Sequence, residues 1–380
     1  MLNLNTRSAQ SDEHALFRTT VQKLLAKELD PNLARWEQDG CIDRAFWLAC
    51  GETGMLCPTV PEPYGGLGLD FTYNAIVNEE LGYRGLGGGI SVQSDIVAEY
   101  IVKIGSESQK LDILPKLVSG EWVSSIAMTE PGAGSDLQGI RTRAQRDGDH
   151  FVISGSKTYI TNGHSADIII VVAKTDPLQS GKGISLFIVE AGRQGFRPGR
   201  MLDKIGQWSS DTSELFFDEV RVPESNLLGS ENAGFGYMMD LLAQERLALA
   251  TSAQGLAQRA FDEAVTFTKG RQAFGKSVFD FQNTRFTLAD LKSKLQVGWA
   301  HLDWAVAKHV QGNLSAAEAS AAKYWHTETL WLVVDAALQM HGGAGYMNEM
   351  TVARLWRDAR VQRIYGGTSE IMREIIGRAL

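Results

Sequence analysis

The spacing of apolar residues divides the chain into three zones. In the first zone apolar positions recur at helical spacing, as at Phe17, Val21 and Leu24. The second zone has short β-branched and aromatic runs between Gly, Asp and Ser turns, which are typical of strands. Helical spacing then returns. The strand runs are 151–154, 168–172, 184–189 and 215–220, and breaks in the later helices lie near 270–276, 312–315 and 341–345. The pattern predicts an α+β fold with a helical domain (1–121), a middle β domain (122–232) and a helical bundle (233–380).

One carboxylate lies within the apolar pattern of the third zone. On a helix, Glu245 shares its face with residues three, four and seven positions away. These neighbours are Met238, Leu241, Leu242, Ala248, Leu249 and Ser252. Burial there would raise the carboxyl pKa and favour a general base that works near neutral pH. The alternative is a structural carboxylate that pairs with another helix, and the local sequence leaves both open.

Composition narrows the function classes. The 380 residues are 44% hydrophobic and carry a net charge of −8, which allows a large core and argues against a nucleic-acid binder. No run has the length and apolarity of a membrane span, and the N-terminus lacks a signal-peptide core. The cysteines Cys41, Cys50 and Cys57 lack CxxC spacing and indicate free thiols in a reducing compartment. We expect a cytoplasmic protein, or one of an organelle matrix if a transit peptide has been removed.

Two short patterns resemble an ATP-binding loop and a metal site, but the surrounding sequence supports neither. Residues 270–277 fit the P-loop expression GxxxxGKS, but a P-loop follows a strand, and here a helical pattern precedes it. His301 and His309 lie two turns apart on an expected helix, where packed or exposed side chains are more common than metal ligands. No GxGxxG occurs, so a Rossmann nicotinamide site has no support. We therefore expect neither an ATPase nor a metal site.

A Gly-rich run opens the β zone. Residues 127–139 read AMTEPGAGSDLQG, and such a turn can present backbone N–H groups to a ring edge or a phosphate. A plain structural turn is the alternative. This run resembles the first signature of the acyl-CoA dehydrogenase family. Further matches are YITNG (159–163), RQAFGK (271–276) and QMHGGAGY (339–346), followed by Glu349, Arg354 and Asp358. The resemblance extends from about Asp12 to Leu380.

The resemblance implies a flavoprotein with a C-terminal four-helix bundle that assembles as a homotetramer. FAD is expected between the β domain and the bundle, with part of its site from a neighbouring subunit. The implied partners are an acyl-CoA substrate and an electron-transfer flavoprotein. The residues implied to bind FAD are Ile126, Met128, Thr129, Gly134, Ser135, Tyr159, Ile160, Thr161, Arg271, Phe274, Gln282, Gln339, Met340, His341, Gly342, Gly343, Thr368, Ser369 and Glu370.

The resemblance also bears on the catalytic base. Many family members have a catalytic glutamate where this chain has Gly366, which offers only its N–H to the developing enolate. The long-chain and isovaleryl branches instead place the base on a bundle helix, in a segment similar to residues 244–247. Glu245 is therefore expected to take the α-proton of the substrate. The residues implied to bind substrate are Ser135, Ala243, Gln244, Arg246, Gly366 and Gly367.

The expected reaction is α,β-dehydrogenation of a medium- to long-chain, straight or branched, acyl-CoA. Arg246 either positions the substrate or forms a salt bridge within the bundle, and the sequence does not decide between these roles. Gly236 leaves space towards the CoA, and residues 85–90 are expected to shape the far end of the acyl pocket. The alternative within the same fold is an enzyme for carrier-protein thioesters, an oxidase or a monooxygenase.

Overall fold

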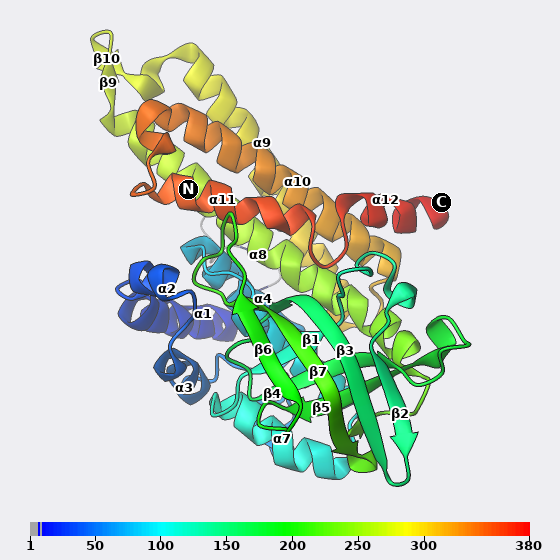
Figure 1. Cartoon of the computed structure of the whole chain (residues 1–380). Helices are drawn as coiled ribbons and strands as arrows, with labels where there is room; N and C mark the ends of the chain where they lie inside the picture. The colour runs from blue at the N-terminus through cyan, green and yellow to red at the C-terminus, as the bar shows by residue number, and fades with distance from the viewer. Residues whose placement is uncertain (1–6, 8–9) are drawn as a thin grey trace.

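The computed structural model describes residue 7 and residues 10–380. Serine side chains cap two of the N-terminal helices: Ser11 accepts from the N–H of His14, and Ser106 accepts from the N–H of Gln109. These helices pack beside the sheet in Figure 1. Their bounds are α1 (Asp12–Leu24), α2 (Leu33–Asp39), α3 (Arg44–Glu52), α4 (Phe71–Arg84), α5 (Gly89–Ser91), α6 (Ala98–Ile104) and α7 (Glu107–Ser119), with a π-helical segment (Val92–Val97) between α5 and α6.

The middle of the chain forms a mainly antiparallel sheet in the order β6-β7-β3-β2-β4-β5-β8, with β1 parallel to β4. Strands β4 and β5 are buried along almost their whole length, because helices cover one face and the facing strands cover the other. The strands are β1 (Ser124–Ala127), β2 (Arg143–Asp147), β3 (His150–Thr161), β4 (Ile168–Lys174), β5 (Ile184–Glu190), β6 (Phe196–Met201), β7 (Thr212–Pro223) and β8 (Leu227–Leu228).

Long helices form the C-terminal bundle. Figure 1 shows α8, α9 and α10 side by side, with α11 across them and a small hairpin at the end farthest from the sheet. Helix α8 has 37 residues, which at 1.5 Å per residue is about 55 Å. The elements are α8 (Gly234–Gly270), β9 (Gln272–Ala273), β10 (Lys276–Ser277), α9 (Gln282–Val310), α10 (Ala316–His341), α11 (Thr351–Ala359) and α12 (Ser369–Arg378). The predicted α+β fold is confirmed, and the P-loop-like run is this hairpin at a helix end.

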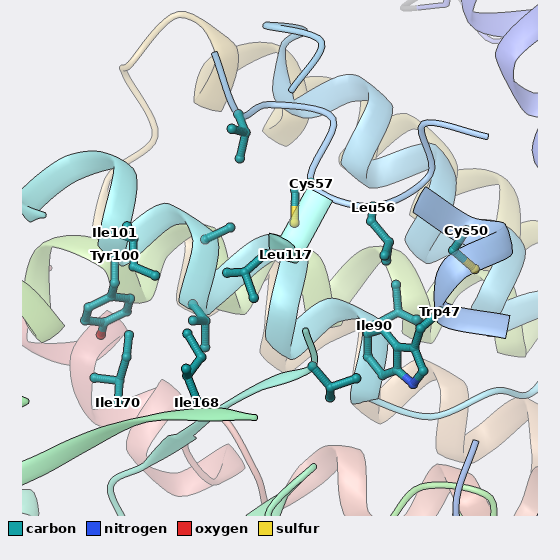
Figure 2. Close-up of a cluster of buried hydrophobic side chains, with 14 of the residues drawn as sticks. Trp47, Cys50, Leu56, Cys57, Ile90, Tyr100, Ile101, Leu117, Ile168 and Ile170 are labelled. Atoms are coloured by element: carbon teal, nitrogen blue, oxygen red, sulfur yellow. The ribbon is translucent and has the colours of Figure 1, made fainter. Parts of the chain in front are cut away.

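A single hydrophobic core joins the N-terminal helices to the sheet. Figure 2 shows Trp47, Leu56 and Leu117 from the helical side, and Tyr100 beside Ile170 of β4. All of these side chains are buried. The core packs α6 against both β4 and α8, and it thereby places Tyr100 next to the carboxylate of Glu245.

The three cysteines of the chain are free thiols, as the sequence predicted. Cys50 and Cys57 are buried free thiols and Cys41 is a half-buried one. Among the residues that the structure describes, no helix combines the length and the apolar character that a membrane crossing requires.

Candidate active site

Glu245 lies in the fourth turn of α8 and is 8% exposed. The hydroxyl of Tyr100 donates to its Oε1 over 3.3 Å. Burial raises the pKa of Glu245 to about 7, while the Tyr100 hydrogen bond and the charge of Arg246 oppose the rise. No ion pair to this carboxylate occurs in the described part of the chain. Glu245 thus has the burial and the pKa of a general base for neutral pH.

Tyr100 was not predicted from the sequence. It comes from α6, is fully buried, and has its own pKa raised well above the usual value by burial and by the charge of Glu245. Its hydroxyl therefore stays protonated and available as a donor. Glu245 and Tyr100 are 145 positions apart, so no local pattern signals their contact.

A two-glycine turn lies close to the base. Gly366 and Gly367 have φ values of +60° and +96°, a conformation that glycine adopts without strain. A Cβ built on Gly366 would be 2.3 Å from Cδ1 of Leu249, which is one helical turn beyond Glu245 on the same face. The exposed Gly366 backbone therefore borders the part of α8 that carries the carboxylate.

Two buried cations lie beside this turn. The Lys323 Nζ donates to the carbonyl oxygen of Gly367 over 2.6 Å, and the Arg246 Nη1 donates to the Oγ of Ser320 over 3.2 Å. Arg246 has no carboxylate partner within the described residues, so the salt bridge considered from the sequence is absent from this part of the chain. Lys323, on α10, is a further residue that the sequence did not single out.

The Gly-rich run of residues 127–139 is an open loop above a buried ion pair. The Lys157 Nζ lies 2.9 Å from Oε1 of Glu130 and donates to the Met128 carbonyl oxygen over 2.9 Å. Built Cβ atoms on Gly132 and Gly134 would have nothing within 4 Å. Lys157 thus holds the inner side of the loop, and the outer surface of the loop is free for a ligand.

The end of β3 continues this surface. Tyr159 has a φ of +60° and is 70% exposed, while Thr161 accepts a hydrogen bond from the Oγ of Ser125 through its carbonyl oxygen over 2.6 Å. The Gln207 Nε2 donates to the Tyr365 hydroxyl over 3.3 Å and so ties the sheet to the two-glycine turn. Through this bond the loop between β6 and β7 meets the base end of the bundle. The first group of predicted residues comprises Ile126, Met128, Thr129, Gly134, Ser135, Tyr159, Ile160 and Thr161 on the sheet side and Glu245, Arg246, Gly366 and Gly367 at the base end.

Eight further predicted flavin residues lie at the far end of the bundle. His341 stacks on Phe267, near the end of α8, with ring centroids 4.2 Å apart. Arg271 follows Glu245 by 26 positions, or about 39 Å of helix. Phe274 is 95% exposed at the tip of the hairpin seen in Figure 1. The residues in this group are Arg271, Phe274, Gln282, Gln339, Met340, His341, Gly342 and Gly343. One chain therefore holds the two groups apart.

Comparison with known sequences covers all three zones. Residues 11–121 match the acyl-CoA dehydrogenase N-terminal domain, residues 125–220 the middle domain, and residues 232–380 the C-terminal domain. The chain belongs to the acyl-CoA dehydrogenase family. Members of this family are flavin-dependent oxidoreductases that act on acyl-CoA, and this chain is an acyl-CoA dehydrogenase by membership.

Individual acyl-CoA dehydrogenases are similar along the whole chain. The mitochondrial long-chain specific enzyme of Sus scrofa is 45% identical over 100% of this chain and 89% of its own length. The mitochondrial isovaleryl-CoA dehydrogenase of Pongo abelii is 37% identical over 97% of this chain and 89% of its own. The resemblance to these two branches is confirmed.

Solved acyl-CoA dehydrogenase structures have the same fold. The enzyme of Geobacillus kaustophilus superposes with a TM-score of 0.96 at 46% identity, over 98% of this chain and 99% of its own. A glutaryl-CoA dehydrogenase of Mycobacterium smegmatis, solved with FADH2, has a TM-score of 0.93 at 28% identity, over 99% of this chain and 96% of its own.

Several predicted site residues of this acyl-CoA dehydrogenase have structural contacts of their own. Gln244 donates through Nε2 to the Asp95 carbonyl oxygen over 3.0 Å and lies 3.1 Å from Nε2 of His309. Ser369 donates to Glu328, and Thr368 caps α12. Glu370 is exposed and Ala243 is half-buried. The ligand roles of these residues remain predictions.

Proposed function

We propose that the chain oxidises a medium- to long-chain, straight or branched, acyl-CoA to the trans-2-enoyl-CoA with FAD as cofactor and Glu245 as the α-proton acceptor. The observation that carries this proposal is the buried Glu245, whose pKa is raised to about 7 by burial, beside the open Gly366 turn. A carboxylic acid with an ordinary pKa would be a weaker base towards a thioester α-carbon.

The sheet surface is suited to a flavin. The free space above Gly132 and Gly134 would admit a polar ring edge or a phosphate, since no side chain obstructs the backbone. The exposed ring of Tyr159 offers an aromatic face next to that loop. When bound, FAD supplies the acceptor for the hydride that leaves the β carbon.

The residues of this chain then perform the proton chemistry. The Glu245 carboxylate takes the α-proton, and the electrons of that C–H bond enter the new double bond as the β hydride departs. Negative charge develops on the thioester oxygen, where the Gly366 N–H is a suitable donor. Tyr100 orients the carboxylate through its hydrogen bond. Packing around Glu245 excludes water, which keeps the carboxylate basic.

The separation of the two residue groups supports a homo-oligomer. Arg271 is about 39 Å along the bundle from Glu245, and Gln282 begins α9 just after the hairpin that follows Arg271. One FAD cannot be held by both groups of a single chain at that distance, so a second copy would complete each site. A tetramer is the assembly that we propose, with an electron-transfer flavoprotein as the electron acceptor and a cytoplasmic or organelle-matrix location.

The test is anaerobic bleaching of the flavin by a panel of straight and branched acyl-CoA thioesters. We expect loss of the yellow absorbance with medium or long chains, together with formation of the trans-2-enoyl product. A flavin that stays oxidised with every CoA thioester would refute the proposal. Bleaching only by carrier-protein thioesters, or rapid oxygen consumption during turnover, would favour the alternative reactions of this fold.

A further inference from the structure

Lys323 is a buried cation that the proposed mechanism leaves unused. Its side chain is 0% exposed, and its Nζ donates to the carbonyl oxygen of Gly367 over 2.6 Å. None of the described carboxylates lies within salt-bridge distance of it. A buried ammonium is costly unless its charge is compensated. This costly charge lies against the two-glycine turn of the proposed active site. Its position there indicates a part in the reaction.

A second cation adds to the positive charge. Arg246 is 5% exposed, its Nη1 donates to Ser320 one turn before Lys323, and its Nε lacks a partner among the described residues. Burial, and after it the charge of Arg246, lowers the pKa of Lys323 to about 8. Glu328 and Glu370 act in the opposite direction.

The nearby acids leave this charge largely uncompensated. Glu328 on α10 is engaged by Arg363, over 2.8 Å, and by the hydroxyl of Ser369, over 2.6 Å. Glu370 on α12 is exposed to solvent, where its charge is screened. The base end of the bundle is therefore electropositive behind Gly366 and Gly367 before a substrate arrives.

The two-glycine turn needs an external support. Gly366 and Gly367 have φ values of +60° and +96° and no side chains, so their own residue type restricts the backbone little. Within the described residues, Lys323 is the side chain that hydrogen-bonds to this dipeptide. An oxyanion donor is effective only when it is fixed before the charge develops.

We propose that Lys323 is a positioning residue for enolate formation, which holds the Gly366–Gly367 turn through the Gly367 carbonyl and places a positive charge behind the Gly366 N–H. The inference rests on the proposed function, because it assumes α-proton removal at Glu245. Lys323 does not touch the substrate. It acts through the peptide, by fixing the donor and by favouring negative charge on the thioester oxygen.

The experiment compares Lys323→Met, Lys323→Arg and wild type as FAD-loaded enzymes. The readout is exchange of the α-hydrogens of a 3-thia-acyl-CoA into deuterated water, followed by mass spectrometry. This probe has sulfur at its β position and cannot donate a hydride, so enolate formation is observed separately from flavin reduction. Melting temperature, FAD content and probe affinity are measured in parallel.

We expect Lys323→Met to exchange roughly 10- to 100-fold more slowly, less than the loss on removing a direct oxyanion donor. Probe affinity and FAD content should stay close to wild type, and the melting temperature should be equal or higher because a buried charge is gone. Lys323→Arg should recover most of the rate. Lys23→Met, a charge removal on the exposed face of α1, is the control and should change nothing.

The pH profile gives a second criterion. Wild-type exchange should fall as pH rises through about 8, where Lys323 loses its proton, whereas the slower Lys323→Met should be flat there. Unchanged exchange in Lys323→Met, or slowed exchange that tracks lost FAD and is not recovered by Arg, overturns the inference. If wild type itself neither exchanges the probe nor bleaches with any thioester, the proposed function fails instead.

Discussion

Two buried glutamates, Glu245 on α8 and Glu79 on α4, show how neighbours decide the charge of a carboxyl group. Their exposed fractions are 8% and 2%. Glu79 lies 2.6 Å from both Arg7 and Arg18, and these two charges hold its pKa below the ordinary value despite burial. Among the described residues, the polar groups that act on Glu245 are a tyrosine hydroxyl and an offset arginine, and burial raises its pKa to about 7.

The two carboxylates are therefore suited to different roles. Glu79 stabilises the structure, whereas Glu245 is suited to proton transfer. The Glu79 region is an ion-pair network that also includes Glu80, which lies 2.7 Å from Arg18, and it joins the start of the chain to α4. Its charges are compensated, so it has no capacity to take up a proton near neutral pH. Glu245 is under-compensated, and this gives it a proton affinity suited to a base.

The largest effect is expected from replacing the carboxylate of Glu245, the proposed base. Glu245→Gln preserves the shape and the contact with Tyr100 but cannot accept a proton. We expect kcat to fall by about 100- to 10,000-fold, while FAD binding is retained and the melting temperature does not fall. Anaerobic stopped-flow measurement of flavin reduction is the assay. Turnover near the wild-type rate would show that another residue is the base.

The corresponding change in the Glu79 region should affect stability and leave the chemistry intact. Arg18→Met leaves Glu79 and Glu80 with less compensation in a buried position. Breaking such a buried pair costs about 3–5 kcal/mol, so the denaturation midpoint should drop clearly while kcat per folded molecule stays unchanged. Arg35→Met, which removes an exposed pair with Asp43, is the control and should have little effect. Equal midpoints for the two variants would contradict the comparison.

The sequence was sufficient for the fold and for the choice of Glu245 as the candidate base. Apolar periodicity placed the helical and strand zones, because burial on one face imposes a regular spacing. The apolar neighbours of Glu245 on its helix face indicated burial, and the glycine at position 366 removed the competing carboxylate. Both are local signals, readable from residues a few positions apart.

The partners of the base could not be predicted in this way. Tyr100 and Lys323 reach the site from α6 and α10, at separations of 145 and 78 positions from Glu245. Their contacts depend on how the helices pack, which one sequence does not encode in any short pattern. That Arg246 forms no salt bridge in the described part of the chain is likewise a tertiary fact, and its role towards the substrate stays a prediction.

The raised pKa of Glu245 also predicts a pH-dependent stability. Because its folded-state pKa of about 7 exceeds the ordinary 4.5, the carboxyl group stabilises the fold below pH 4.5, and this contribution is lost as pH rises through 7. Glu245→Gln removes the cost of ionisation. The variant should therefore be more stable than wild type at pH 8, by up to about 3 kcal/mol, and the advantage should shrink at pH 5. Thermal melts at equal protein concentration measure it, and a constant difference across pH would contradict it.

The smallest effect should come from the hydroxyl of Tyr100. It donates to the Glu245 carboxylate and so lowers the pKa of that group against the effect of burial. Tyr100→Phe removes the donor and keeps the ring in the core shown in Figure 2. The acidic limb of kcat, expected near pH 7 in wild type, should then move to higher pH by up to roughly one unit, since such a bond is worth about 1.5 kcal/mol.

A control variant separates the loss of the hydrogen bond to Glu245 from any change in core packing that Tyr100→Phe causes. Tyr83→Phe, which removes another tyrosine hydroxyl from a carboxylate, Asp262, over 3.1 Å, is the matched control and should leave the limb in place. A lower plateau rate with an unmoved limb would mean that Tyr100 orients the base without tuning it. A limb that moves to lower pH would contradict the assigned donor, because loss of a hydrogen bond to the charged form raises the pKa of an acid.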